Sequence, residues 1–183
     1  MKRLGLLRHA KSEEYEPQGR DFDRGLNEKG RRAAREIGRF IAADAPSFDL
    51  VIASPARRVQ ETLDLALGAL GSQSPAAREE DRRLYLATAD SIADVVAERG
   101  GKAENLLIAA HNPGLADFLL DRVPPSEDDT LRAEIERKYP TGAFTLLEFP
   151  TDDWAQIGSA PARLTMLKRP RDLDPSLGPE LVR

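Results

Sequence analysis

Three short apolar runs, each ending at polar residues, constrain the fold of this chain more than any other feature of its sequence. The runs span residues 4–7, 50–53 and 106–110, and they end at Arg8-His9, Ser54-Pro55 and His111-Asn112-Pro113. Short continuous apolar runs are typical of strands that are buried on both faces, as in a parallel sheet. The runs are also far shorter than the roughly 20 residues that a helical membrane span needs.

Apolar residues at helical spacing lie between these runs, and Asn27 is a good N-cap for the first of the helices they predict. The four stripes are Ala33, Ile37, Phe40 and Ile41; Val59, Leu63, Ala66, Leu67 and Leu70; Ile92, Val95 and Val96; and Leu115, Phe118 and Leu119. Alternating strands and helices predict an α/β fold with three layers, in which helices cover both faces of a mainly parallel central sheet. Further strands are predicted at 143–149 and 162–167, the latter antiparallel at an edge.

The chain has 183 residues, enough for a single domain with a substantial core. We predict a domain over residues 1–168 and a surface tail over 169–183 that lies loosely. Residues 124–142 open with two prolines and close with Pro140-Thr141-Gly142, so they are predicted to form an inserted loop with a helical stretch at 130–138.

The bulk composition excludes several classes of protein. A formal net charge of −4 argues against a general grip on nucleic acid or on an anionic membrane. The chain has no cysteine, so disulfides and thiolate chemistry are excluded. Arg8 and His9 interrupt the first apolar run too early for a signal peptide. We therefore predict a soluble cytoplasmic protein with no nucleic-acid or membrane partner.

Four side chains that suit phosphate chemistry follow the three runs. Arg8 and His9 follow the first run, Arg57 the second and His111 the third. In open α/β sheets, ligands bind outside the carboxyl ends of the strands. Guanidinium groups match phosphate oxygens with planar forks of donors. The sequence therefore predicts a phosphate pocket at this edge of the sheet.

Helix starts are predicted beside the same pocket. Ser54 and Asn112 each precede a proline, as an N-cap residue precedes proline at the first helical position. The amino-terminal end of a helix carries free N–H groups and a partial positive charge, which favour a bound anion.

Both histidines of the chain fall at this edge. A neutral imidazole can attack phosphorus and so divides one difficult displacement into two easier ones. The arginines and the second histidine can neutralise the charge of the phosphoryl group as it moves. The scheme requires no metal ion or other cofactor.

Five blocks of sequence carry a resemblance to a known family. They are residues 6–12 (LLRHAKS), 24–27 (RGLN) with Gly30, 54–62 (SPARRVQET), 110–115 (AHNPGL) and 168–173 (KRPRDL). The first resembles the Arg-His-Gly/Ala signature of the histidine phosphatase superfamily, and the third its Ser-Pro-x-x-Arg-x-x-Gln-Thr block. The fourth resembles its His-Asn-Pro-Gly block. The second and fifth resemble segments of its small SixA-type phosphohistidine phosphatases. The matches run in family order from residue 4 to about 173.

The resemblance implies roles for individual residues. His9 would be the phosphorylated nucleophile, and Arg8 and Arg57 would bind the phosphate. His111 would be the second pocket histidine, with Asn112 beside it among the substrate-binding residues. Arg24 either lines the pocket mouth or only anchors the loop before the first helix.

One departure from the family pattern concerns the general acid. Larger members carry a glutamate in a Leu-x-Glu segment, and the matching stretch here is Leu84-Tyr85-Leu86. A positioned acid contributes about 10²–10⁴-fold, most of all for a poor leaving group. The SixA-type branch lacks this acid. The sequence therefore favours a phosphatase acting on phosphohistidine in a protein.

Two alternatives remain open at this stage. A small-molecule phosphomonoesterase would need an acid from Glu79, Glu80, Asp81 or a loop. A phosphate-binding module without activity would not need both His9 and the arginines. The sequence names neither the physiological substrate nor the oligomeric state.

Overall fold

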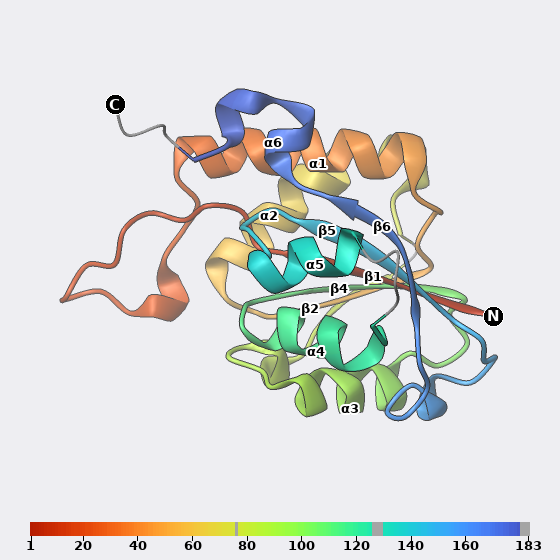
Figure 1. Cartoon of the computed structure of the whole chain (residues 1–183). Coiled ribbons are helices and arrows are strands. Elements are labelled where there is room, and N and C mark those ends of the chain that lie inside the picture. The colour runs from red at the N-terminus through yellow and green to blue at the C-terminus, as the bar shows by residue number, and fades with distance from the viewer. Residues whose placement is uncertain (76, 126–129, 180–183) are drawn as a thin grey trace.

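A computed structural model describes residues 1–75, 77–125 and 130–179, and its centre is a six-stranded sheet (Figure 1). The strands are β1 (Lys2–Arg8), β2 (Leu50–Ala53), β3 (Ala77–Glu80), β4 (Asn105–Ala110), β5 (Phe144–Phe149) and β6 (Arg163–Lys168). They lie in the order β3-β2-β4-β1-β5-β6. The four from β3 to β1 are parallel, whereas β5 is antiparallel to both β1 and β6. This confirms the predicted α/β class and the antiparallel pairing at one edge.

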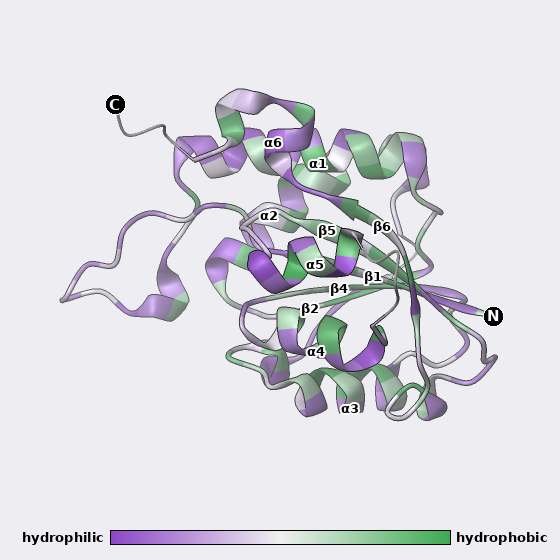
Figure 2. Ribbon diagram, viewed as in Figure 1, coloured by the Kyte–Doolittle hydropathy of each residue, from purple (hydrophilic) through white to green (hydrophobic). Residues whose placement is uncertain are grey.

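Helices cover both faces of the sheet, as Figure 1 shows. They are α1 (Glu28–Asp44), α2 (Arg57–Gly68), α3 (Ala89–Arg99), α4 (Gly114–Arg122), α5 (Thr130–Arg137) and the short α6 (Pro170–Leu173). Alternate residues of β4 face the two layers. Leu106 and Ile108 join the apolar cluster of α3, α4 and α5, whereas Leu107 joins that of α1 and α2. Figure 2 shows largely hydrophobic central strands between helices of mixed character.

One strand was missed by the sequence reasoning. The four residues of β3 read Ala-Arg-Glu-Glu and contain no apolar run. The strand pairs with β2 at the edge of the sheet, and most of its residues are exposed. Its backbone pairing, rather than buried side chains, therefore defines it.

The two helices predicted at Ser54-Pro55 and Asn112-Pro113 begin later than expected. The first, α2, begins at Arg57, after Ala56, and α4 begins at Gly114, after Pro113. Asn27, by contrast, caps α1 as predicted, since its side chain accepts a hydrogen bond from Gly30 N–H. Gly114 allows a close approach, because a Cβ there would lie 2.2 Å from the Ala87 carbonyl oxygen.

The carboxy-terminal segment packs against α1 instead of lying loosely. Leu177 is buried beside residues of α1. Lys29 donates to the Gly178 carbonyl, and Arg32 donates to Asp174 and Ser176. Residues 180–183 lie outside the described residues. The helical stretch predicted inside the 124–142 loop is α5, while residues 126–129 of that loop are also outside the description.

Within the described ranges, the longest helices fall short of the length and apolarity required to cross a bilayer.

Candidate active site

His9 follows β1 and lies in a buried, fixed position. Its backbone N–H donates to Ala110, and its carbonyl accepts from Gly142 N–H. Its side chain is 7% exposed, and Nδ1 lies 2.8 Å from the carbonyl oxygen of Ala10. Burial, with smaller contributions from His111, Arg58 and Arg8, lowers the pKa of His9 to about 3. The ring is therefore neutral at pH 7, with its proton on Nδ1 and a lone pair on Nε2.

The turn after His9 is held by α1 and α2. Ala10 N–H donates to Thr62 Oγ1 at 2.9 Å, and the Thr62 hydroxyl in turn donates to the Arg58 carbonyl. On the α1 side, a Cβ at Gly30 would lie 1.9 Å from the Lys11 carbonyl oxygen. Only glycine permits this contact, so Gly30 and Thr62 together fix the backbone that presents the His9 ring.

His111 follows β4, next to β1, and its ring centroid lies 5.2 Å from that of His9. Its Nε2 lies 2.8 Å from Ser54 Oγ, which accepts a hydrogen bond from Ala56 N–H. Burial, followed by the nearby charge of Arg58, lowers the pKa of His111 to about 3. If the Ser54 hydroxyl donates to Nε2, the neutral ring carries its proton on Nδ1, which has no protein partner.

Two arginines approach the histidines from different elements. The first, Arg8, ends β1 and donates from Nη1 to the Tyr139 carbonyl at 2.7 Å. The second, Arg58, lies in the first turn of α2 and is 3% exposed. Its Nη1 and Nη2 donate to the carbonyl oxygen and the carboxylate of Asp21 at 2.7 and 3.0 Å. Both guanidiniums are therefore held in place before a ligand arrives.

Arg57, the residue that the sequence reasoning placed in the pocket, points elsewhere. Its side chain is 61% exposed, and its Nε donates to Glu61 at 2.7 Å. Successive helical residues point about 100° apart, so only one of two adjacent arginines can face the histidines. That residue is Arg58. The spacing in the family block already indicated it, because two residues separate Pro55 from the arginine in Ser-Pro-x-x-Arg.

Asp21 binds several groups of the site, and sequence reasoning missed it. It accepts hydrogen bonds from Arg58, Arg24 and the Tyr85 hydroxyl, the last at 2.9 Å. Burial alone would raise its pKa, but these hydrogen bonds outweigh burial and lower the pKa to about 2. Asp21 is therefore an ionised carboxylate at neutral pH. No sequence signal marked it, because it lies between β1 and α1, outside the apolar runs and the family blocks.

Arg24 and Asn112 both lie at the cavity, and each also holds a neighbouring segment. Arg24 donates to Asp21 and to the Glu13 carbonyl, so it combines the two roles considered from sequence. Asn112 donates to the Tyr139 carbonyl at 3.0 Å, the same oxygen that accepts from Arg8.

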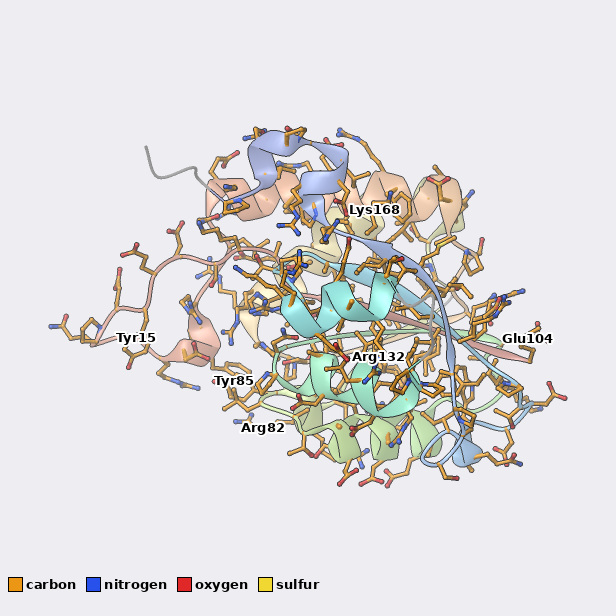
Figure 3. The ribbon with its side chains drawn as sticks, in the orientation of Figure 1. Tyr15, Arg82, Tyr85, Glu104, Arg132 and Lys168 are labelled. Atoms are coloured by element: carbon orange, nitrogen blue, oxygen red, sulfur yellow. The ribbon has the colours of Figure 1, made fainter. Side chains whose placement is uncertain are left out.

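These side chains surround a cavity of about 570 Å³. Figure 3 places Tyr85 near the base of the long loop before α1. Four buried nitrogen atoms of the lining residues lack a hydrogen-bond partner: Arg8 Nε, Arg24 Nε, Arg58 Nε and His111 Nδ1. Unsatisfied buried donors are costly, and a tetrahedral oxyanion could satisfy such groups. The full lining is Arg8, His9, Lys11, Ser12, Asp21, Arg24, Arg58, Tyr85, Leu86, His111, Asn112 and Thr141.

Leu86, which the sequence resemblance sets at the position of the missing acid, lines the cavity and is 68% exposed. The three nearby acids, Glu79, Glu80 and Asp81, lie outside the cavity lining, and Glu80 is exposed. Glu79 and Asp81 pair with Arg99, and hydrogen bonds from Arg83 help to keep the pKa of Asp81 low. Among the lining residues, Asp21 is the one carboxylate, and it is ionised.

Comparisons with known proteins identify the family that this chain resembles. Residues 4–84 match the family model of the histidine phosphatase superfamily (branch 1). An uncharacterised protein of Mycobacterium tuberculosis is 31% identical over 166 residues, which cover 90% of this chain and all of the relative.

Two solved structures are also similar over nearly their whole length. A candidate phosphohistidine phosphatase SixA from Nakamurella multipartitia has a TM-score of 0.79 and 27% identity, covering 92% of this chain and 96% of its own. A second candidate SixA, from Agrobacterium tumefaciens, has a TM-score of 0.75 and 26% identity, covering 91% and 97%.

Proposed function

Because this chain belongs to the histidine phosphatase superfamily, we propose that it is a phosphatase that removes the phosphoryl group from phosphohistidine in a protein, with His9 as the nucleophile. Arg8, Arg58 and His111 bind the phosphoryl oxygens. Arg24 and Asn112 border the same cavity and complete the substrate-binding set.

The reaction takes two displacements at phosphorus. In the first, the lone pair on His9 Nε2 attacks, the bond from phosphorus to the substrate nitrogen breaks, and the substrate imidazole leaves. The His9 ring keeps its Nδ1 proton, which forms a hydrogen bond to the Ala10 carbonyl, and so carries the phosphoryl group as an imidazolium. In the second, water attacks phosphorus, inorganic phosphate leaves, and His9 returns to its neutral form.

The ionisation of Asp21, the carboxylate among the cavity-lining residues, is the observation that favours phosphohistidine as the substrate. Asp21 is ionised by its hydrogen bonds, and Leu86 supplies no proton, so the described lining residues include no protonated carboxylic acid. An alkoxide leaving group needs such an acid. When the other ring nitrogen of the phosphohistidine is protonated, its imidazole leaves as a neutral group, and no acid is needed. The cavity therefore favours substrates with a labile phosphorus–nitrogen bond over sugar phosphates.

A comparison of two small substrates tests this proposal without knowledge of the protein partner. Phosphoramidate offers a phosphorus–nitrogen bond, and glycerol phosphate offers an alkoxide. We expect phosphoramidate to be hydrolysed more than about 100-fold faster, from the usual contribution of a positioned acid. A protein phosphorylated on histidine is the third substrate. Faster hydrolysis of glycerol phosphate would contradict the account given for Asp21 and Leu86.

Trapping of the intermediate tests the nucleophile. Wild-type protein quenched during turnover of phosphoramidate should carry an acid-labile, alkali-stable phosphoryl group, and His9→Ala should carry none. Arg57→Ala is the matched control, because Arg57 lies outside the cavity and the variant should still be labelled. A labelled His9→Ala protein would overturn the assignment of the nucleophile.

A further inference from the structure

A second hollow adjoins the catalytic cavity and is lined almost entirely by basic and apolar residues. It has a volume of about 340 Å³ and shares Arg8, Lys11 and Thr141 with the cavity. It lies among the start of α1, the segment after α5 and the carboxy-terminal segment. We call it the basic groove, and its charged lining residues are Arg8, Lys11, Lys29, Lys138, Arg169 and Arg171.

None of the described residues that line the basic groove is acidic. Arg169 is neutralised by Asp172 and Glu134 behind it, and Lys29 donates to the Gly178 carbonyl. The remaining charges are less engaged. Within the described part of the chain, Lys11, Lys138 and Arg171 are exposed and form no ion pair. A chain of net charge −4 therefore presents an uncompensated positive region directly beside its phosphate cavity.

The form of these charges indicates the kind of ligand. A site for one tight phosphate gathers buried donors around a single point, as the catalytic cavity does with Arg8 and Arg58. The free cations of the basic groove come instead from three separate segments and remain hydrated. Exposed charges spread along a groove suit several carboxylates spaced along a chain, and they contribute mainly to orientation and association rate.

We propose that the basic groove binds an acidic segment of the protein that carries the phosphohistidine. This inference rests on the proposed function, because it places that segment next to the phosphohistidine in the cavity. The two hollows share Arg8, Lys11 and Thr141, so a peptide in the groove continues without a gap into the cavity. The groove supplies recognition, and the cavity supplies the chemistry.

A double variant with a matched control tests this role. Lys138→Gln with Arg171→Gln removes two charges from the groove and leaves every residue of the cavity in place. Arg35→Gln with Lys102→Gln removes the same charge from exposed positions outside the groove. The substrates are two phosphohistidine peptides that differ only in flanking residues, aspartate and glutamate in one, asparagine and glutamine in the other.

The groove variant should lose about 5- to 20-fold in kcat/KM on the acidic peptide at low salt, mainly through KM. The control variant should lose less than about 2-fold, and 0.3 M salt should narrow the difference between groove variant and wild type. Equal losses in the two variants, or an equal loss on the neutral peptide, would overturn the proposal. The proposal would also fail if the two substitutions weakened binding of a small bisphosphate but did not affect the acidic peptide.

Direct binding separates this inference from the proposed function. A fluorescent acidic peptide without phosphate should bind wild-type protein several-fold more tightly than the groove variant, measured by anisotropy. If it does so while neither phosphopeptide is hydrolysed, the groove stands and the proposed substrate class fails. If both peptides are hydrolysed but binding is the same in the two proteins, the groove fails and the proposed function stands.

Discussion

The catalytic cavity and the basic groove share part of their lining, yet they hold positive charge in opposite ways. In the cavity, Arg58 is 3% exposed and its guanidinium donates to Asp21. In the groove, Lys138 and Arg171 are exposed. Buried, fixed charge acts strongly on a reacting group and is little affected by salt, whereas exposed charge is screened. The buried charge of the cavity therefore suits stabilisation of a transferring phosphoryl group, and the exposed charge of the groove suits attraction of a partner.

A third hollow sharpens this contrast because its charge has the opposite sign. It is formed by the loop between β1 and α1 and is lined by four acids, Glu13, Glu14, Glu16 and Asp23, together with Arg20, Arg24 and Arg57. Arg24 belongs both to this hollow and to the catalytic cavity. Figure 3 places Tyr15 at the far end of the loop. An acidic partner would therefore approach the cavity from the groove side and not from the loop side.

The largest expected effect distinguishes a buried charge from an exposed one at adjacent positions. Arg58→Gln should lower kcat by about 10²–10³-fold, as removal of one preorganised donor does in other enzymes. Arg57→Gln should change kcat by less than about 3-fold, because that side chain is 61% exposed and pairs with Glu61. Steady-state kinetics on phosphoramidate provides the measurement.

The comparison needs a stability control, because Arg58 also holds Asp21. Melting temperatures of both variants, measured with and without vanadate as a phosphate analogue, separate the two effects. A folded Arg58→Gln protein should no longer be stabilised by vanadate. Near-normal turnover in that variant, with a large loss in Arg57→Gln, would restore the original assignment of Arg57 as the phosphate ligand.

Those two arginines also show how far the sequence determines the site. The apolar runs predicted the strand ends, and the strand ends placed His9 and His111 side by side, because parallel strands share one carboxyl edge. The choice between adjacent arginines depends on which of them α2 turns toward the histidines, and the strand ends do not carry that information, whereas the Ser-Pro-x-x-Arg spacing does. Pattern reasoning locates an edge of a sheet better than it locates the first turn of a helix.

Features held by backbone contacts were beyond the sequence. The edge strand β3 has no apolar run, and Asp21 binds Arg58 and Tyr85 only because the folded chain brings its loop against α2 and Tyr85. The basic groove combines Lys11, Lys138 and Arg171 from three distant segments, and no pattern in the sequence linked these residues to one another. The groove forms only because the carboxy-terminal segment packs on α1, so the prediction of a loose tail gave no reason to expect it.

The second prediction uses burial, the property that separates the cavity from the groove. The folded-state pKa of each histidine is lowered to about 3 from an ordinary value of 6.5. Below pH 6.5 the unfolded chain therefore binds protons that the folded chain excludes, and stability falls as the pH falls. Between pH 7.5 and 5 the loss should be about 2 kcal/mol per histidine.

Urea unfolding in phosphate-free buffer at the two pH values measures this loss. The His9→Ala variant should show about 2 kcal/mol less pH dependence than wild type, and the groove variant (Lys138→Gln with Arg171→Gln) should match wild type. The low pKa of Asp21 does not interfere, because its contribution is lost only below about pH 4. Equal pH dependence in wild type and His9→Ala would mean that the folded protein does not keep His9 desolvated.

The smallest expected effect concerns the proton that His111 directs into the cavity. Ser54 Oγ lies 2.8 Å from His111 Nε2, and we expect this hydroxyl to donate to Nε2 and so to keep the ring proton on Nδ1. Ser54→Ala should leave KM nearly unchanged and lower kcat by about 10-fold, the value of one hydrogen bond of about 1.4 kcal/mol. The kcat of Ser54→Cys, whose thiol is similar in size but a weaker donor, should fall between those of wild type and Ser54→Ala.

A purely structural role for Ser54 would lower stability without moving this proton, so the readout must report on the ring itself. The chain has two histidines, and ¹⁵N-labelled imidazoles therefore give two sets of signals. In wild type both rings should be neutral with Nδ1 protonated, for His9 because of the Ala10 carbonyl and for His111 because of Ser54. In Ser54→Ala only the His111 signals should shift toward a mixture of tautomers. If they stay unchanged while kcat falls, Ser54 acts through the start of α2 and not through His111, since its oxygen also accepts from Ala56 N–H.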